Sequence, residues 1–192
     1  MDFPLGPRFQ MAMAFAARVH TGQFRKGTTV PYLSHVLAVT ATALENGAGE
    51  DVAIASLLHD AVEDGGGLPV LEEIRARFGP AVADLVLECT DALSVPKPPW
   101  RQRKEAYLAH LAEASDGARL IVLGDKLHNC RSLVRDLRAC GPALWARFNA
   151  GPGETVWYYR SVVDILARRG RTPLLEELDA AVEELERAIP GA

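Results

Sequence analysis

Four side chains able to do acid–base or metal chemistry lie within six residues of the sequence, at His59, Asp60, Glu63 and Asp64. They follow a mostly aliphatic run, 52–58, that predicts a buried helix. If this helix continues through the cluster, His59 and Glu63 share one face, and Asp60 and Asp64 share the next. Burying this much charge is unfavourable unless it is neutralised, which a divalent metal would do. A solvated acidic helix end is the alternative, and the adjoining apolar run disfavours it.

A second polar group lies in another apolar stretch, 120–132. Asp125 follows four aliphatic residues and Gly124, so we expect it to be buried and to need a partner. Asn129 and Ser132 fall on the same helical face as Asp125. The alternative to a ligand role for this acid is a structural hydrogen bond or ion pair. Gly124 would allow another helix or a ligand to approach the backbone closely.

A metal held by one histidine and one carboxylate needs further donors, and His35 is a candidate. A lone histidine on an amphipathic helix is more often a core residue, so this assignment depends on the first cluster. Together His35, His59, Asp60 and Asp125 would form a site with two nitrogen and two carboxylate donors. That set suits Mn²⁺, Fe²⁺, Co²⁺ or Zn²⁺ better than Ca²⁺.

Glu63 and Asp64 remain once four ligands are assigned. Each lies about one turn beyond the first metal-ligand candidates, where a group that orients or deprotonates an attacking water would stand. A pair of solvent-facing acids is the alternative for either residue.

Basic residues that could hold an anionic substrate occur in two places. Arg25 and Lys26 lie in a glycine-containing segment a few residues before His35, and we interpret them as phosphate or base contacts. The basic group at 97–104 we interpret as solvated surface. In the aromatic cluster 157–159, one ring could line a base pocket.

Helical periodicity runs through nearly the whole chain, and no stretch alternates convincingly as a strand. The fold class predicted is all-α, with about ten helices in a single domain, 1–192, whose core is 7–169 and whose last helix is acidic. The predicted helices are 7–20, 34–44, one beginning at 50, 68–78, 81–92, 101–114, 117–137, 142–148, 154–168 and 173–188.

The composition excludes several classes of protein. The 192 residues are 48% apolar and carry a net charge of −4, which argues against a general nucleic-acid binder. No apolar run approaches the ~20 residues of a membrane span. The three cysteines lack metal-ligand spacing, and no signal peptide is evident, so we expect reduced thiols in a cytoplasmic protein.

Three blocks of the sequence resemble the HD-domain metal phosphohydrolases, and more narrowly the hydrolase domain of the RelA/SpoT alarmone enzymes. The resemblance runs from about residue 7 to 168. The blocks are His20-Thr21-Gly22-Gln23-Phe24-Arg25-Lys26 with Pro31-Tyr32-x-x-His35, then Leu58-His59-Asp60-x-x-Glu63-Asp64, then Asp125-Lys126-Leu127-His128-Asn129-x-Arg131.

The resemblance implies a compact helical fold and a small stand-alone alarmone hydrolase. It implies that the enzyme removes the 3′-diphosphate of guanosine tetra- or pentaphosphate, giving GDP or GTP and pyrophosphate. It also implies roles for particular residues: one Mn²⁺ held by His35, His59, Asp60 and Asp125; the attacking water managed by Glu63 and Asp64; and the substrate contacted by Arg25, Lys26, Asn129, Ser132 and Tyr158.

The chain departs from the family pattern in two places, both of which bear on substrate preference. Cys89-Thr90-Asp91 stands where a Val-Thr-Lys type sequence is usual, and Gly65-Gly66-Gly67 replaces a threonine-containing turn. Two alternatives therefore stay open. One is a phosphohydrolase acting on another phosphorylated nucleotide or cofactor, such as the 2′-phosphate of NADPH. The other is a nucleotide-binding regulator without turnover.

Overall fold

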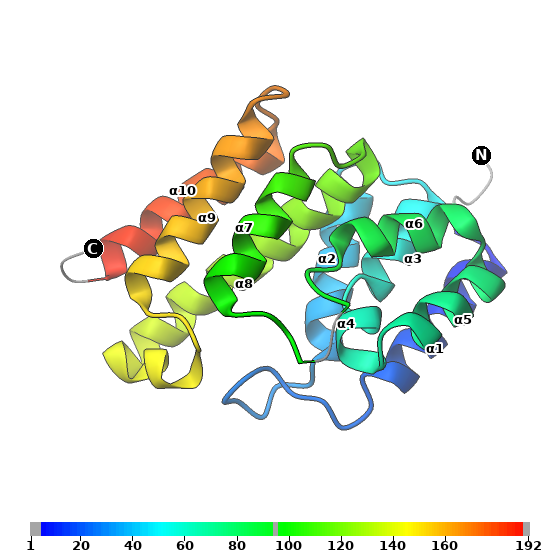
Figure 1. Ribbon diagram of the computed structural model, residues 1–192, viewed down its shortest axis with the longest axis horizontal. Helices are drawn as coiled ribbons and strands as arrows, with labels where there is room; N and C mark the ends of the chain where they lie inside the picture. The colour runs from blue at the N-terminus through cyan, green and yellow to red at the C-terminus, as the bar shows by residue number, and fades with distance from the viewer. Residues whose placement is uncertain (1–4, 94–95, 190–192) are drawn as a thin grey trace. The chain divides into compact units, whose positions relative to one another are not determined.

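A computed structural model describes residues 5–93 and 96–189 of the chain (Figure 1). Within them the only extended pairing is an isolated bridge between Phe24 and Pro31, which confirms the all-α prediction. The elements are α1 (Pro7–Val19), α2 (Leu33–Glu45), α3 (Glu50–Leu58), α4 (Ala61–Gly65), α5 (Leu68–Phe78), α6 (Pro80–Cys89), α7 (Trp100–Leu111), α8 (Asp116–Cys140), the 3-10 helix η1 (Gly141–Arg147), α9 (Pro152–Ala167) and α10 (Pro173–Ala188).

The ends of the helices follow local sequence chemistry. Helix α10 has the predicted bounds, because Thr172 caps its first turn by accepting a hydrogen bond from the Leu175 amide at 3.2 Å. Helix α8 continues three residues beyond the predicted end at Leu137, and stops where Gly141 adopts a φ of 60°. Helix α6 ends at Cys89, earlier than predicted.

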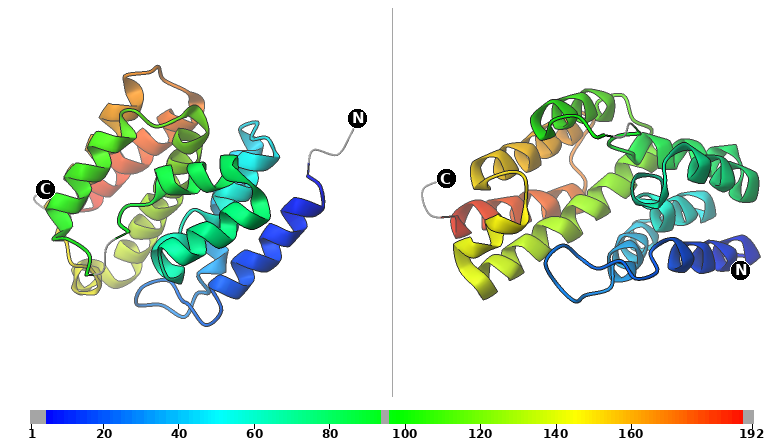
Figure 2. Two further views of the ribbon diagram at one scale, coloured as in Figure 1. Left: turned by 45° about the vertical axis from the view of Figure 1, so that its right-hand side comes forward. Right: turned by 60° about the horizontal axis from the view of Figure 1, so that its bottom comes forward.

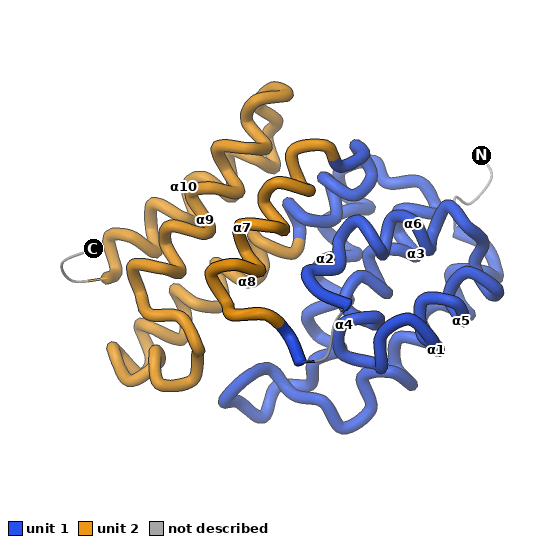
Figure 3. The backbone as a smooth tube through the Cα atoms, in the orientation of Figure 1, with its two compact units in different colours: residues 1–97, 114–124 blue, residues 98–113, 125–192 orange. Residues whose placement is uncertain are grey.

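The chain forms two compact units (Figure 3). Unit 1 comprises residues 1–97 and 114–124, and unit 2 comprises residues 98–113 and 125–192. The single domain expected from the sequence stays a prediction. Among the described helices, none has the length and apolar character needed to cross a membrane.

Helix α3 is the centre of unit 1. Its residues from Ala53 to Leu58 are all buried, and it packs against α1, α2 and α6. Ile54, Leu57 and Leu58 are fully buried, and each such side chain contributes about 1.5–3 kcal/mol through removal of apolar surface from water. The polar residues that follow α3 are therefore held by a rigid support.

The first part of α8 belongs to unit 1 and lies against α2. A methyl group placed on Gly124 would come 3.4 Å from the Val39 carbonyl oxygen and 3.5 Å from Thr42 Cβ. The two helices thus approach closely at this glycine, as the sequence predicts.

Unit 2 contains α7, α9, α10 and the remainder of α8. Helices α9 and α10 pack side by side (Figure 2), and the apolar side of α10 is buried at Leu174, Leu178 and Leu185. Its acids are neutralised in part by Arg160 of α9, which forms ion pairs with Asp179 and Glu186. This explains how an acidic C-terminal helix docks stably.

Candidate metal and catalytic site

The polar cluster at His59 stands at a break between two helices. The prediction that one helix carries His59 through Asp64 is wrong, because α3 ends at Leu58 and α4 begins at Ala61. Asp60 has φ −97° and ψ −4°, in the bridge region of backbone space, so regular helix is interrupted there. The face inferred for His59 and Glu63 spans this break, whereas Asp60 and Asp64 stay one helical turn apart, since the Asp64 amide donates to the Asp60 carbonyl oxygen at 3.0 Å.

Three of the predicted metal ligands come together in unit 1. Ring nitrogens of His35 and His59 lie within 4.8 Å of each other. Asp60 Oδ2 lies 3.0 Å from His59 Nε2 and 3.5 Å from His35 Nε2. His35 is fully buried and His59 is 3% exposed. The structure thus places two imidazoles and one carboxylate around a single point inside unit 1.

The hydrogen bond of His59 to the backbone determines which ring nitrogen faces Asp60. His59 Nδ1 lies 2.8 Å from the Ser56 carbonyl oxygen, which can only accept, so Nδ1 carries the hydrogen. In the neutral ring Nε2 then presents a lone pair toward the Asp60 carboxylate. Two facing electron-pair donors in a buried place favour a shared cation, which can be a proton or a metal ion, and imidazole and carboxylate donors suit a first-row divalent ion.

The surroundings of Asp60 favour an ionised and oriented carboxylate, as a metal ligand requires. Burial alone would raise the pKa of Asp60, but His59 and His35 lower that pKa well below its usual value. The Tyr32 hydroxyl donates a hydrogen bond of 2.6 Å to Asp60 Oδ2. The Tyr32 ring also lies edge-on to His35, with centroids 5.4 Å apart. Tyr32 therefore orients the carboxylate, a role that helical periodicity did not indicate.

Asp125, the fourth predicted ligand, begins the second segment of unit 2 and directly follows Gly124 in the unbroken helix α8. It is buried, as predicted, with 7% of its surface exposed. Asn129 donates a hydrogen bond to its Oδ1, and Lys126 Nζ lies 2.6 Å from its Oδ2. Burial would lower the pKa of Lys126, but the Asp125 carboxylate raises it well above its usual value, so the lysine is charged.

The two predicted water-handling acids have different partners in unit 1. Glu63 Oε1 accepts a hydrogen bond of 2.6 Å from Lys97 Nζ. Lys97 is exposed, as the interpretation of this basic group as solvated surface expects, and it also reaches an acid 34 positions away, which that interpretation did not indicate. Asp64 Oδ2 accepts a 2.7 Å hydrogen bond from the Gln23 side chain. Partial desolvation and the nearby Asp60 charge raise the pKa of Asp64.

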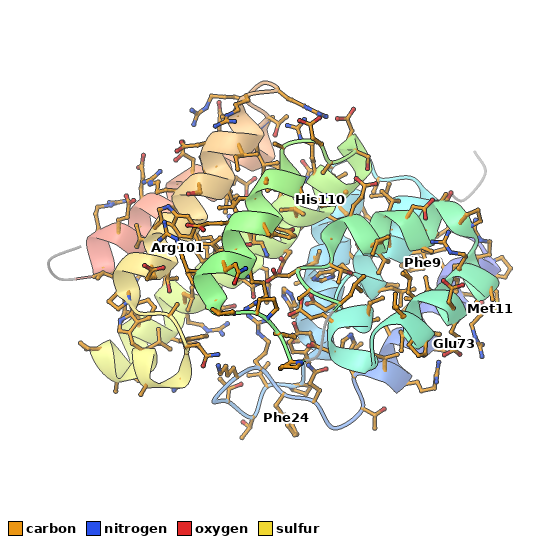
Figure 4. The ribbon with its side chains drawn as sticks, viewed as in Figure 1. Phe9, Met11, Phe24, Glu73, Arg101 and His110 are labelled. Atoms are coloured by element: carbon orange, nitrogen blue, oxygen red, sulfur yellow. The ribbon has the colours of Figure 1, made fainter. Side chains whose placement is uncertain are left out.

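The segment with Arg25 and Lys26 folds back on itself between α1 and α2. The Arg25 amide donates to the Val30 carbonyl at 2.8 Å, and the Arg25 guanidinium lies 5.6 Å from the centre of the Tyr32 ring. Lys26 is exposed. Phe24, 55% exposed, lies at the outer edge of this loop (Figure 4). Arg25 is thus anchored next to the tyrosine that contacts Asp60.

The predicted substrate contacts of unit 2 lie on α8 and α9. Ser132 is buried, and Asn129 contacts Asp125 as described above. Tyr158 is 5% exposed, and its hydroxyl has no hydrogen-bond partner among the described residues. The ammonium groups of Lys104 and Lys126 lie 4.6 Å and 5.6 Å from the centre of the Tyr158 ring. The two lysines add positive charge that the sequence interpretation did not assign.

Two further histidines lie outside the predicted ligand set. His20 is buried and contacts Gln23, and His110 lies on the surface of α7 (Figure 4).

Comparisons with known proteins agree with this arrangement. Residues 12–153 match the HD domain family. A guanosine-3′,5′-bis(diphosphate) 3′-pyrophosphohydrolase of Xenopus tropicalis is 38% identical over 138 residues, covering 70% of this chain and 72% of that protein. Another from Haemophilus influenzae is 35% identical over 126 residues, covering 62% of this chain and 17% of that protein. A solved structure of a metazoan ortholog of SpoT that hydrolyzes ppGpp has a TM-score of 0.76 and 29% identity, covering 96% of this chain and 98% of that one.

Proposed function

We propose, on the premise that this chain belongs to the HD domain family, that it is a metal-dependent phosphohydrolase of guanosine 3′,5′-bis(diphosphate). The matched region spans most of the chain, and the relative from Xenopus tropicalis, named for this activity, is covered over 72% of its length. The products would be pyrophosphate and a guanosine 5′-diphosphate, or the 5′-triphosphate from the pentaphosphate.

The observation that carries the proposal is the pair of buried imidazoles facing Asp60. His35, His59 and Asp60 would hold the ion, and we propose Asp125 as the fourth ligand. Chain continuity supports this choice: Gly124 fits against α2 one turn after His35, and Asp125 is the next residue of the same helix. When bound, a divalent ion supplies Lewis acidity that makes water a better nucleophile and screens phosphate charge.

The reaction consists of water attacking the phosphorus attached to the 3′-oxygen of the ribose. The bond between this phosphorus and the 3′-oxygen breaks, pyrophosphate leaves and the 3′-oxygen takes up a proton. We assign Glu63 and Asp64 to orient the attacking water and accept its proton. Both residues follow the proposed ligand Asp60 closely in the sequence. Lys97 donates a hydrogen bond to the Glu63 carboxylate, and Gln23 donates one to the Asp64 carboxylate.

Substrate binding would fall to residues with positive charge or ring surfaces. Arg25 and Lys26 would contact the purine and phosphates, since Arg25 is anchored beside Tyr32. Asn129, Ser132 and Tyr158 would contact the nucleotide from α8 and α9. The buried Tyr158 hydroxyl supports this assignment, because a buried hydroxyl without a partner is unfavourable until a ligand supplies one.

We further propose Mn²⁺ as the ion and the cytoplasm as the place of action. The mixed nitrogen and oxygen donor set suits Mn²⁺ and does not exclude other first-row ions. Cys89, Cys130 and Cys140 form no disulfide in the described residues, which supports a reducing compartment.

The test is incubation of the purified protein and Mn²⁺ with a panel of nucleotides, followed by chromatographic identification of products. We expect pyrophosphate and GDP from guanosine 3′,5′-bis(diphosphate), and loss of both bound metal and activity in Asp125→Ala. Release of phosphate from NADPH, without any hydrolysis of the guanosine 3′-diphosphate, would overturn the substrate assignment and keep the metal site. Stoichiometric metal in Asp125→Ala would remove Asp125 from the ligand set.

A further inference from the structure

Three side chains of unit 1 form a continuous hydrogen-bonded chain that leads to Asp64. His20 Nδ1 lies 2.6 Å from Gln23 Oε1, and Gln23 Nε2 donates to Asp64 Oδ2 at 2.7 Å. His20 is 4% exposed, whereas the Asp64 side chain opens onto solvent. The chain therefore runs from a buried imidazole to an accessible carboxylate.

Donor and acceptor chemistry fixes the orientation of every group in this chain. An ionised carboxylate only accepts, so the Gln23 amide must present its NH₂ group to Asp64. The Gln23 oxygen then faces His20, whose Nδ1 must carry a hydrogen. If the amide were reversed, its oxygen would face the carboxylate. The Asp64 carboxylate thus sets which way round the Gln23 amide stands, and a hydrogen on His20 Nδ1 stabilises that orientation.

The backbone holds Gln23 in place independently of these side chains. The Tyr32 amide donates to the Gln23 carbonyl oxygen at 2.9 Å, and the bridge between Phe24 and Pro31 lies next to it. Tyr32 is also the donor to Asp60 Oδ2. The segment from 20 to 32 therefore carries one hydrogen-bond donor for the metal-ligand candidate and another for Asp64.

We infer that Gln23 is a positioning residue that holds the Asp64 carboxylate in one rotational state, and that His20 holds the Gln23 amide for this purpose. The inference rests on the proposed function, because its expected effect on kcat assumes that the protein hydrolyses the guanosine 3′-diphosphate. The terminal torsion of an aspartate is broad, so a carboxylate without a fixed donor rotates. With one oxygen fixed by Gln23, the other oxygen of Asp64 is directed to the attacking water.

The kinetic test uses Gln23→Met, which keeps the length of the side chain and removes both polar ends. We expect kcat to fall by about tenfold, with KM and metal stoichiometry within about twofold of wild type, because misorientation of a catalytic group affects the chemical step. In an Asp64→Asn background the same substitution should cause no further fall in kcat. Gln10→Ala, an exposed glutamine of α1, is the matched control.

Substitutions of His20 separate orientation from packing. Asn places an amide NH₂ close to where Nδ1 stands, whereas Leu has similar volume and no donor. We expect His20→Asn to keep most of kcat and His20→Leu to lose it to the level of Gln23→Met. Equal kcat values in the Asn and Leu variants would overturn the role of His20.

A readout without turnover tests the hydrogen-bonded chain itself. The side-chain amide resonance of Gln23 in a ¹⁵N–¹H spectrum is assigned as the one missing in Gln23→Met. It should shift in both Asp64→Asn and His20→Leu, and stay in place in Gln10→Ala. If it shifts in neither, the chain of contacts is refuted. If the wild type releases no pyrophosphate, the proposed function fails while the resonance still decides the inference.

Discussion

Substitution of Tyr32 by phenylalanine removes one hydroxyl group and preserves the ring. The hydroxyl donates the 2.6 Å hydrogen bond to Asp60 Oδ2, and the ring contacts of Tyr32 with His20 and His35, at 5.0 Å and 5.4 Å between centroids, would remain. The variant therefore changes the orientation and charge stabilisation of one proposed metal ligand and leaves the surrounding packing intact.

The size of the effect follows from the kind of bond that is lost. A hydrogen bond to an ionised group contributes about 1.5–3 kcal/mol net. If that free energy acts on the metal complex, with about 1.4 kcal/mol for each factor of ten, the dissociation constant rises by about 10- to 100-fold. The metal-free protein should lose less stability, because Asp60 keeps its contacts with His59 and His35.

The measurement is titration of metal-free protein with Mn²⁺, together with thermal unfolding at saturating and zero metal. Tyr159→Phe, in α9 of unit 2, is the control for loss of a tyrosine hydroxyl and should keep the wild-type dissociation constant. An unchanged dissociation constant in Tyr32→Phe, with a normal metal stoichiometry, would refute the argument that this hydroxyl orients a ligand.

Three other perturbations give separate outcomes. Glu63→Gln and Asp64→Asn should retain metal and lower kcat by about 100-fold or more, measured as pyrophosphate release; loss of metal instead would make the residue a ligand. Arg25→Ala should raise KM for the guanosine 3′-diphosphate more than it lowers kcat, and the reverse pattern in steady-state kinetics would contradict a ground-state contact. Arg160→Met should reduce the free energy of unfolding by about 1 kcal/mol at pH 7. Hydrogen bonds from Arg160 lower the pKa of Glu186, so this contribution is complete above its ordinary value of 4.5 and disappears as pH falls through the lower folded pKa. Chemical denaturation from pH 7 down to pH 3 should show the variant converging with wild type, and a constant difference would be inconsistent with the ion pair.

The sequence predicts the helices well because helical periodicity and capping are local signals. The acidic last helix begins and ends where predicted, and burial of Asp125 follows from the aliphatic residues before it. His35 could be chosen only by requiring further donors for the metal. The structure brings His35, His59 and Asp60 together in unit 1, and their role as metal ligands stays a prediction.

Long-range side-chain pairs lie beyond such local signals. Gln23 contacts an acid 41 positions away, and Lys97 contacts one 34 positions away. The sequence around Gln23 and around Lys97 is that of an ordinary loop. No local pattern therefore distinguishes these two residues from solvated surface residues. Gln23 stands in the block with Arg25 and Lys26 that resembles the RelA/SpoT hydrolase domain, and this position was the one available signal for its importance.

The break between α3 and α4 explains how adjacent residues serve one site. On a regular helix, successive side chains point about 100° apart, so a histidine and the following aspartate would diverge. Asp60 lies between α3 and α4, with ψ −4°, and its Oδ2 comes to 3.0 Å from His59 Nε2. The buried part of α3, from Ala53 to Leu58, fixes His59 from one side, and the Tyr32 hydroxyl fixes Asp60 from the other. The break between α3 and α4, which helical periodicity does not predict, thus allows His59 and Asp60 to converge on one point.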